Sequence, residues 1–182
     1  KEGISPVTII DEEIIPALNE VGEKFEKKIM FLPQLLASAE AAKAAFELIK
    51  AVMPKKQGGQ DKRIVLATVK GDIHDIGKNI VRALLENYGF DVLDLGRDVP
   101  PEEVLKAVSE NKVRLAGLSA LMTTTVPAME ETIKLLHQKC PWSRVEVGGA
   151  VLTQEYADMI KADKYAKDAM ETVRYAQELF KA

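Results

Sequence analysis

The spacing of hydrophobic residues changes near residue 57. Before that point, apolar residues recur every three or four positions over two stretches, about 11–28 and 32–52, which predicts two amphipathic helices. Asp11 is the expected N-cap of the first helix, with acidic residues following it at the positive end of the helix dipole. Pro16 indicates that the regular helix either begins later than Asp11 or bends there.

From residue 63 onward, short apolar runs alternate with helical patterns. Such alternation predicts a parallel sheet covered on both faces, here a five-stranded, doubly wound, flavodoxin-like α/β domain. The charged, Gly-containing stretch 54–62 is typical of a linker, so we expect a helical region over 1–57 and the α/β domain over 58–182. The expected strands are 64–69, 91–95, 114–119, 144–147 and 164–166, and the expected helices are 77–88, 101–110, 126–138, 153–160 and 168–180.

Two helices form an incomplete bundle, because a lone hairpin cannot bury both apolar stripes. We therefore expect further helices from upstream residues or from a second subunit, the latter giving a dimer. The chain begins at Lys1 without an initiator Met, which also suggests a piece of a longer protein.

Composition excludes several classes of function. The chain has 182 residues, of which 47% are apolar and 29% charged, as in soluble globular proteins, and no apolar run is long enough for a membrane span. A net charge of −3 and 5% aromatic residues argue against nucleic-acid binding. The single cysteine, Cys140, favours a reducing, cytoplasmic setting, and two histidines with one cysteine are too few for a structural zinc site.

Candidate chemistry lies in the loops that follow the strands, since ligands of doubly wound sheets bind at the carboxyl ends of the strands. Residues 70–77 follow the first strand, 119–125 the third, and 148–150 the fourth. Within the first loop, Asp72 and His74 are spaced so that the carboxylate can fix the tautomer of the imidazole, as it does for metal-ligating or basic histidines.

Two other interpretations of these residues remain open at this point. His74 can be an ordinary loop histidine beside an acid. Alternatively, Ser119 or Thr125 can be the nucleophile of a catalytic triad, although no G-x-S-x-G elbow is present. Nothing convergent surrounds His137, Cys140 or Trp142 in the sequence, so we expect them to be structural or surface residues.

Three elements together resemble the signature of cobalamin-binding domains: Asp72-x-His74-x-x-Gly77, Ser119-x-Leu121 and Gly148-Gly149. The resemblance implies a corrinoid cofactor, cobalamin, whose cobalt is bound from below by His74. It also implies that the displaced nucleotide tail enters a slot lined by the Ser and Gly-Gly loops. Thr125 stands where methionine synthases often have Ser, the third member of a relay with His74 and Asp72. The remaining cofactor contacts implied are Asp11, Gly71, Ile73, Asp75, Thr123 and Ala169.

The helical half resembles the cap of the methyl-carrying branch of this family, through Phe25 and the string Met30-Phe31-Leu32-Pro33-Gln34. The resemblance implies that Phe25, Leu32 and Leu35 cover the upper face of the corrin and shield the methyl group. The alternative is that these three residues belong to the core of a helical bundle, as is common for apolar residues at helical spacing.

The function implied is that of a methyl carrier of a cobalamin-dependent methyltransferase, with methylcobalamin as its working form. Methionine synthase is the expected enzyme, so the partners would be methyltetrahydrofolate and homocysteine domains in the same chain or another. The alternative is a stand-alone corrinoid protein of a methylamine or methanol methyltransferase system. A cobalamin-based sensor is a weaker alternative, and an adenosylcobalamin mutase weaker still.

Overall fold

The computed structural model describes residues 9–52 and 62–181, which form two compact units. One unit holds residues 9–52 together with 83–89, and the other holds 62–82 together with 90–181. Most of the expected linker 54–62, and the boundary between 57 and 58, lie outside the described residues. The division into domains 1–57 and 58–182 therefore stays a prediction.

The first unit begins with a π-helical turn, η1 (Ile10–Ile14), followed by α2 (Ile15–Glu26) and α3 (Leu32–Val52). The expectation that Asp11 is the N-cap is wrong, because the backbone is already helical there and the N-cap of α2 is Ile14. Pro16 is the second residue of α2 and directly follows the π-helical turn. The regular α-helix therefore begins later than Asp11, which was the first of the two possibilities indicated by Pro16.

A side chain caps the N-terminus of α3. The Oε1 atom of Gln34 accepts a hydrogen bond of 2.9 Å from the N–H of Phe31, which is half of a capping box. On α2, exposed Lys24–Glu20 and Lys27–Glu23 pairs lie one helical turn apart at 2.6 and 3.2 Å. Each such pair adds only about 0.3–0.5 kcal/mol, so burial of apolar side chains is the larger stabilising contribution.

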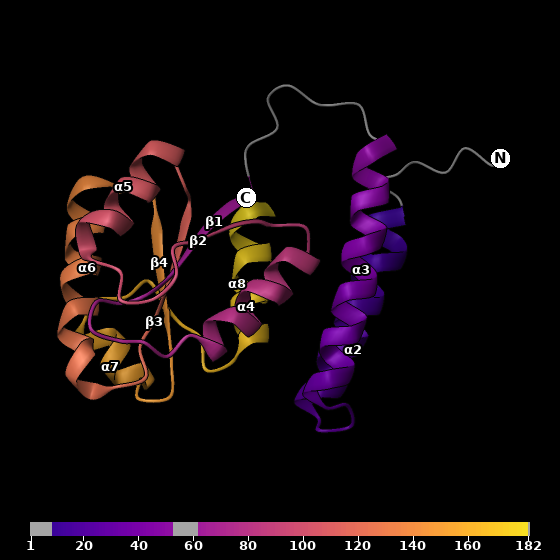
Figure 1. The fold of residues 1–182 in the computed structure, drawn as a ribbon, viewed down its shortest axis with the longest axis horizontal. Coiled ribbons are helices and arrows are strands. Elements are labelled where there is room, and N and C mark those ends of the chain that lie inside the picture. The colour runs from indigo at the N-terminus through magenta and orange to yellow at the C-terminus, as the bar shows by residue number, and fades with distance from the viewer. Residues whose placement is uncertain (1–8, 53–61, 182) are drawn as a thin grey trace. The chain divides into compact units, whose positions relative to one another are not determined.

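The second unit is built on a five-stranded parallel sheet with strand order β2-β1-β3-β4-β5. Figure 1 shows helices on both sides of this sheet. This order confirms the flavodoxin-like fold expected from the alternation of strands and helices. The strands are β1 (Arg63–Thr68), β2 (Asp91–Asp94), β3 (Leu115–Ser119), β4 (Arg144–Gly148) and β5 (Lys164–Tyr165).

The helices follow the strands nearly as expected, with ends that differ by one or two residues. The one addition is a 3-10 turn, η2 (Thr123–Thr125), which precedes α6. No helix in the ranges 9–52 and 62–181 is both long and apolar enough to cross a bilayer. The helices are α4 (Ile76–Asn87), α5 (Pro101–Asn111), α6 (Val126–Lys139), α7 (Gln154–Met159) and α8 (Ala169–Lys181).

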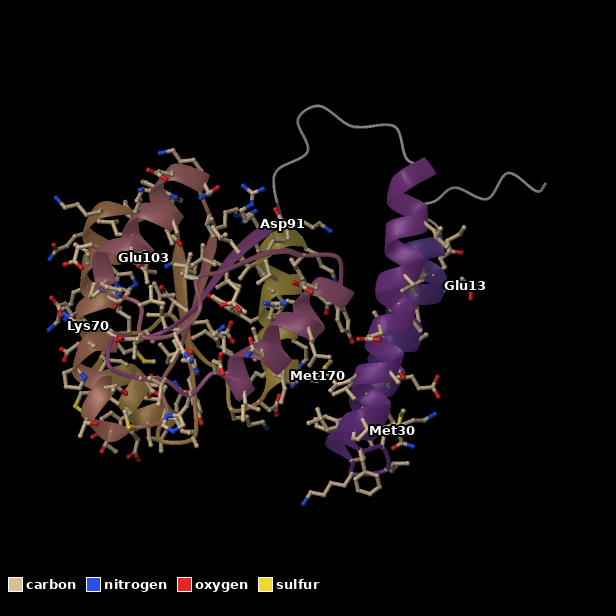
Figure 2. All side chains as sticks on the ribbon, viewed as in Figure 1. Glu13, Met30, Lys70, Asp91, Glu103 and Met170 are labelled. Atoms are coloured by element: carbon tan, nitrogen blue, oxygen red, sulfur yellow. The ribbon has the colours of Figure 1, made fainter. Side chains whose placement is uncertain are left out.

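The two faces of the sheet are covered by different helices. On one face, alternate strand residues such as Val65 and Val147 join a buried cluster that includes Met129 and Ile133 of α6. On the other face lies α8, where Met170 is buried and labelled in Figure 2. Because successive side chains of a strand point to opposite faces, each strand contributes to both layers.

Gly149, which follows β4, lies unusually close to the neighbouring loop. Its φ is +136°, and a Cβ atom placed there would lie 1.8 Å from the carbonyl oxygen of Ala120. The same two segments are joined by a hydrogen bond of 3.2 Å from the N–H of Ala120 to the carbonyl of Gly148. Only glycine fits this close contact between the loops that follow β3 and β4.

The substitution Gly149→Ala should destabilise the protein by about 2–5 kcal/mol, because the added methyl group collides with backbone and the φ value is unfavourable. Gly77→Ala is the matched control, since a Cβ at Gly77 meets no atom within 4 Å and its φ is ordinary. Urea denaturation of both variants without cofactor measures the difference. Equal stability of the two variants would contradict the close approach of the loops.

Candidate functional site

Three loops meet where β1, β3 and β4 end. Thr68, Ser119 and Gly148 are paired across these strands at the same level of the sheet. The loops that follow them therefore start side by side, as the topology predicts for a parallel sheet. The expected loops 70–77, 119–125 and 148–150 are thus brought to one edge.

Asp72 is the centre of this edge, and its side chain is fully buried. Its Oδ1 atom accepts hydrogen bonds from the N–H of His74 at 3.0 Å and from the ring Nδ1 at 2.8 Å. Its Oδ2 atom accepts from the N–H groups of Leu121 at 2.7 Å and Met122 at 3.2 Å. One carboxylate therefore joins the loop after β1 to the loop after β3.

The hydroxyl of Thr125 completes the partners of Asp72. Its Oγ1 atom lies 3.0 Å from Asp72 Oδ2 and 2.8 Å from the carbonyl oxygen of Met122, so its single proton is shared between two acceptors. Thr125 is held there because it ends the turn η2 just before α6. The structure thus brings His74, Asp72 and Thr125 into one connected network.

The surroundings of Asp72 keep it ionised. Burial alone would raise the pKa of this carboxyl, but the hydrogen bonds from Leu121, His74 and Thr125 outweigh that effect and hold the pKa well below its usual range. An ionised carboxylate can only accept hydrogen bonds, so the ring Nδ1 of His74 carries a proton in this contact.

His74 differs from Asp72 in exposure, because 45% of its side chain is accessible to solvent. With a proton fixed on Nδ1, a neutral imidazole presents the lone pair of Nε2. Within 9–52 and 62–181, Nε2 makes no hydrogen bond. His74 therefore offers one ligand atom of fixed orientation to a group outside the protein.

Asp98 also holds the loop that carries His74, and the sequence did not single it out. Its Oδ1 atom accepts from the N–H of Gly71 at 2.7 Å, and its own N–H donates to the carbonyl of Asp72 at 2.9 Å. Gly71 has a φ of +84°, which favours glycine at this bend. Asp98 lies in the loop after β2, the strand next to β1, so only the strand order brings it to this site.

Exposed apolar side chains flank the imidazole. Ile73, Ile76 and Leu121 are 61%, 78% and 41% exposed. Ile73 and Ile76 lie within two residues of His74 in the sequence, and the N–H of Leu121 donates to Asp72. A nitrogen ligand surrounded by apolar side chains suits a large, partly apolar group that carries a metal. No cluster of three or more His, Cys, Asp or Glu side chains that could hold a metal alone occurs in the described ranges.

The nucleophile interpretation finds no geometric support. The hydroxyl of Thr125 contacts Asp72 rather than His74, and no hydrogen bond joins Ser119 to His74 in the part of the chain described. A serine or threonine nucleophile needs an adjacent base to accept its proton.

The other expected site residues lie in several places, and their roles stay predictions. Asp75 immediately precedes α4, Gly77 is in its first turn, Thr123 begins η2 and Ala169 begins α8. The remaining four belong to the first unit: Asp11 in η1, Phe25 and Leu32, which are partly exposed, and Leu35, which is buried.

The second histidine is part of a separate hydrogen-bond network. His137 Nε2 lies 2.9 Å from Asp163, which also accepts from Arg144 at 2.8 Å and from the N–H of Val145. Cys140 is buried, and the ammonium of Lys112 lies 4.7 Å from the centre of the Trp142 ring. These contacts agree with the expectation that the three are structural or surface residues; Trp142 is exposed.

Comparison with known families gives two matches, both described as B12 binding domains. One covers residues 62–174 and the other residues 1–50. The chain is 41% identical to dimethylamine corrinoid protein 1 of Methanosarcina acetivorans, over 98% of this chain and 85% of the relative.

Two solved structures are similar over most of the chain. The methanol:cobalamin methyltransferase complex of Methanosarcina barkeri matches with a TM-score of 0.82 and 32% identity, over 98% of this chain and 69% of that one. A cobalamin-binding protein of Desulfitobacterium hafniense matches with a TM-score of 0.77 and 34% identity, over 89% and 77%. The chain therefore belongs to the B12-binding domain family and is a corrinoid protein, the cobalamin-carrying component of a methyltransferase system.

Proposed function

We propose that this chain carries a methyl group on cobalamin within a methylamine methyltransferase system, with His74 as the lower ligand of cobalt. The observation that carries the proposal is the exposed imidazole of His74, whose Nδ1 is held by the buried carboxylate of Asp72. The family supplies the cofactor, and the geometry supplies a single nitrogen ligand for it.

The relatives support the second of the two functions expected from the sequence. They are named as corrinoid proteins for dimethylamine and trimethylamine, and the match to each covers more than four-fifths of its length. A methionine synthase module, with methyltetrahydrofolate and homocysteine domains as partners, has no such support. The proposed partners are therefore a methyltransferase that takes the methyl group from a methylated amine and another that removes it.

Asp72 and Thr125 act in this proposal by holding His74. When bound, cobalamin supplies a cobalt that accepts and releases a methyl group. His74 would hold that cobalt through Nε2, and Asp72 would determine how firmly, because it fixes both the ring and the backbone of His74. Thr125 in turn donates to Asp72 and helps to fix the carboxylate.

We propose that Ser119, Gly148, Gly149 and Ala169 receive the nucleotide tail, as the family resemblance implies. Ser119 and Gly148 are neighbours in the sheet and point to the same face. Ala169 begins α8, which covers that face. Small side chains at these positions leave the backbone accessible to a ligand.

Phe25, Leu32 and Leu35 are proposed to cover the opposite face of the corrin. They lie on α2 and α3, which form a hairpin of two helices. Large apolar side chains there would exclude water from the methyl group until a partner enzyme binds.

The methyl donor can be identified directly. The full chain, loaded with hydroxocobalamin and reduced, is incubated with one deuterium-labelled donor and its methyltransferase at a time. We expect label on the bound corrinoid from a methylated amine, measured by mass spectrometry. Label from methanol alone, or from methyltetrahydrofolate alone, would overturn the assignment to methylamines.

His74→Gly should retain the cofactor but change its visible spectrum to that of a corrinoid without a lower nitrogen ligand, because the tail contacts remain and only the axial nitrogen is lost. Added imidazole should restore the spectrum. His137→Gly is the matched control, since His137 pairs with Asp163 in a separate network. A parental spectrum in His74→Gly would rule out His74 as the ligand.

Thr125→Val keeps the shape of the side chain but removes the hydroxyl that donates to Asp72. We expect a loss of about 1–2 kcal/mol in the free energy of unfolding, since one hydrogen bond to a buried charge disappears. Thr125→Ser should retain most of that energy. Urea denaturation, together with the visible spectrum of the cofactor-loaded proteins, distinguishes the two variants. Equal behaviour of Thr125→Val and Thr125→Ser would exclude a role for the hydroxyl.

A further inference from the structure

Glu146, in the middle of β4, is a buried carboxyl group without a partner. Its side chain is 2% exposed, and neither Oε1 nor Oε2 accepts a hydrogen bond from any described residue. An unpaired carboxyl in the interior costs free energy, whereas an apolar side chain of similar size would not. The position therefore needs a reason that the fold alone does not provide.

The side chain of Glu146 points to the face of the sheet that carries Ser119 and Gly148. Val145 and Val147, its neighbours along β4, both belong to the buried cluster on the opposite face. Glu146 pairs with Gly117 of β3, one row below the Ser119–Gly148 pair. Two residues along a strand span about 7 Å, so the carboxyl lies one row deeper on the face proposed to receive the tail.

The charged groups nearest to Glu146 are occupied elsewhere. Lys164 of β5 lies opposite Glu146 of β4 in the sheet register. Its ammonium group, however, donates to Glu171 at 3.0 Å. Tyr175 and Thr172 of α8 face the same region. Burial raises the pKa of Glu146 to about 7, against the opposing influence of Thr172 and Lys164. A large fraction of Glu146 is therefore protonated at neutral pH and has an O–H to donate.

We propose that Glu146, in its protonated form, donates a hydrogen bond to the free ring nitrogen of the heterocyclic base that ends the nucleotide tail of the corrinoid. This inference rests on the proposed function, because the base nitrogen is free only when His74 takes its place on cobalt. Glu146 would then determine specificity: the chain would prefer corrinoids whose base has an accepting ring nitrogen over corrinoids with a phenolic base or without a base.

The test compares the full chain with Glu146→Met and Glu146→Gln. Each protein is titrated at pH 6.5 with cobalamin, with a phenolic cobamide and with cobinamide, which lacks the nucleotide. Glu146→Met should bind cobalamin about tenfold more weakly than the parent, as expected for one buried hydrogen bond, and should bind the other two corrinoids equally well. Glu146→Gln should keep the affinity for cobalamin, because its amide also donates.

The dependence on pH gives a second readout. Affinity of the parent for cobalamin should fall as the pH rises from 6 to 8, because Glu146 loses the proton that it donates; Glu146→Gln should show no such fall. Binding of cobinamide should be unaffected in both proteins. Both substitutions remove a buried carboxyl group that has no hydrogen-bond partner, so we expect neither to prevent folding, which urea denaturation checks.

The outcomes separate this inference from the proposed function. If Glu146→Met binds cobalamin as tightly as the parent, or loses cobinamide to the same extent, Glu146 does not contact the base and the inference is overturned. If the parent binds cobalamin but its spectrum shows no ligand from His74, the proposed function fails first. A parent chain that takes up no corrinoid overturns both.

Discussion

The buried carboxylate of Asp72 is the interaction on which the site depends. It accepts hydrogen bonds from the ring and the backbone N–H of His74, which lies in its own loop. It also accepts from Leu121 and Thr125, about fifty residues further along the chain. A charge placed there would be costly without these donors, and with them it stays ionised. The same set of bonds fixes the proton of His74 on Nδ1 and leaves Nε2 without a hydrogen bond from the described residues, as the proposed ligand role requires.

The sheet makes this arrangement possible because it brings the ends of β1, β3 and β4 to one level. The loops after β3 and β4 then approach so closely that only Gly149 fits between them. Ser119 and Gly148 present small groups to the face covered by α8, and Glu146 adds a single protonatable group one row deeper. On this second face, the small and polar positions at the end of the sheet lie beside buried apolar residues such as Ile64 and Leu66.

Residues that act through local sequence were predictable, and residues that act through distant contacts were not. The alternation of apolar runs gave the strands and helices to within one or two residues, because burial on both faces requires that pattern. The N-cap at Asp11 was wrong, because a π-helical turn extends the helix before Pro16. Asp98 and Glu146 went unnoticed, since an acidic residue after a strand or within one shows no period that marks its partners. The expected enzyme, methionine synthase, is not supported by the relatives, which are named as dimethylamine and trimethylamine corrinoid proteins.

The sequence by itself determined the doubly wound fold and the three loops that meet at its edge, because strand order and short connections leave few topologies for such a pattern. Together with the resemblance to known B12-binding domains, it also singled out His74 and Asp72 as a candidate pair, and the structure shows the two in contact. Only the tertiary structure decided the protonation of that pair, the role of Asp98 and the isolation of Glu146. Each of these depends on the dielectric surroundings and on donors supplied by other segments, which three-dimensional packing alone brings within hydrogen-bond distance.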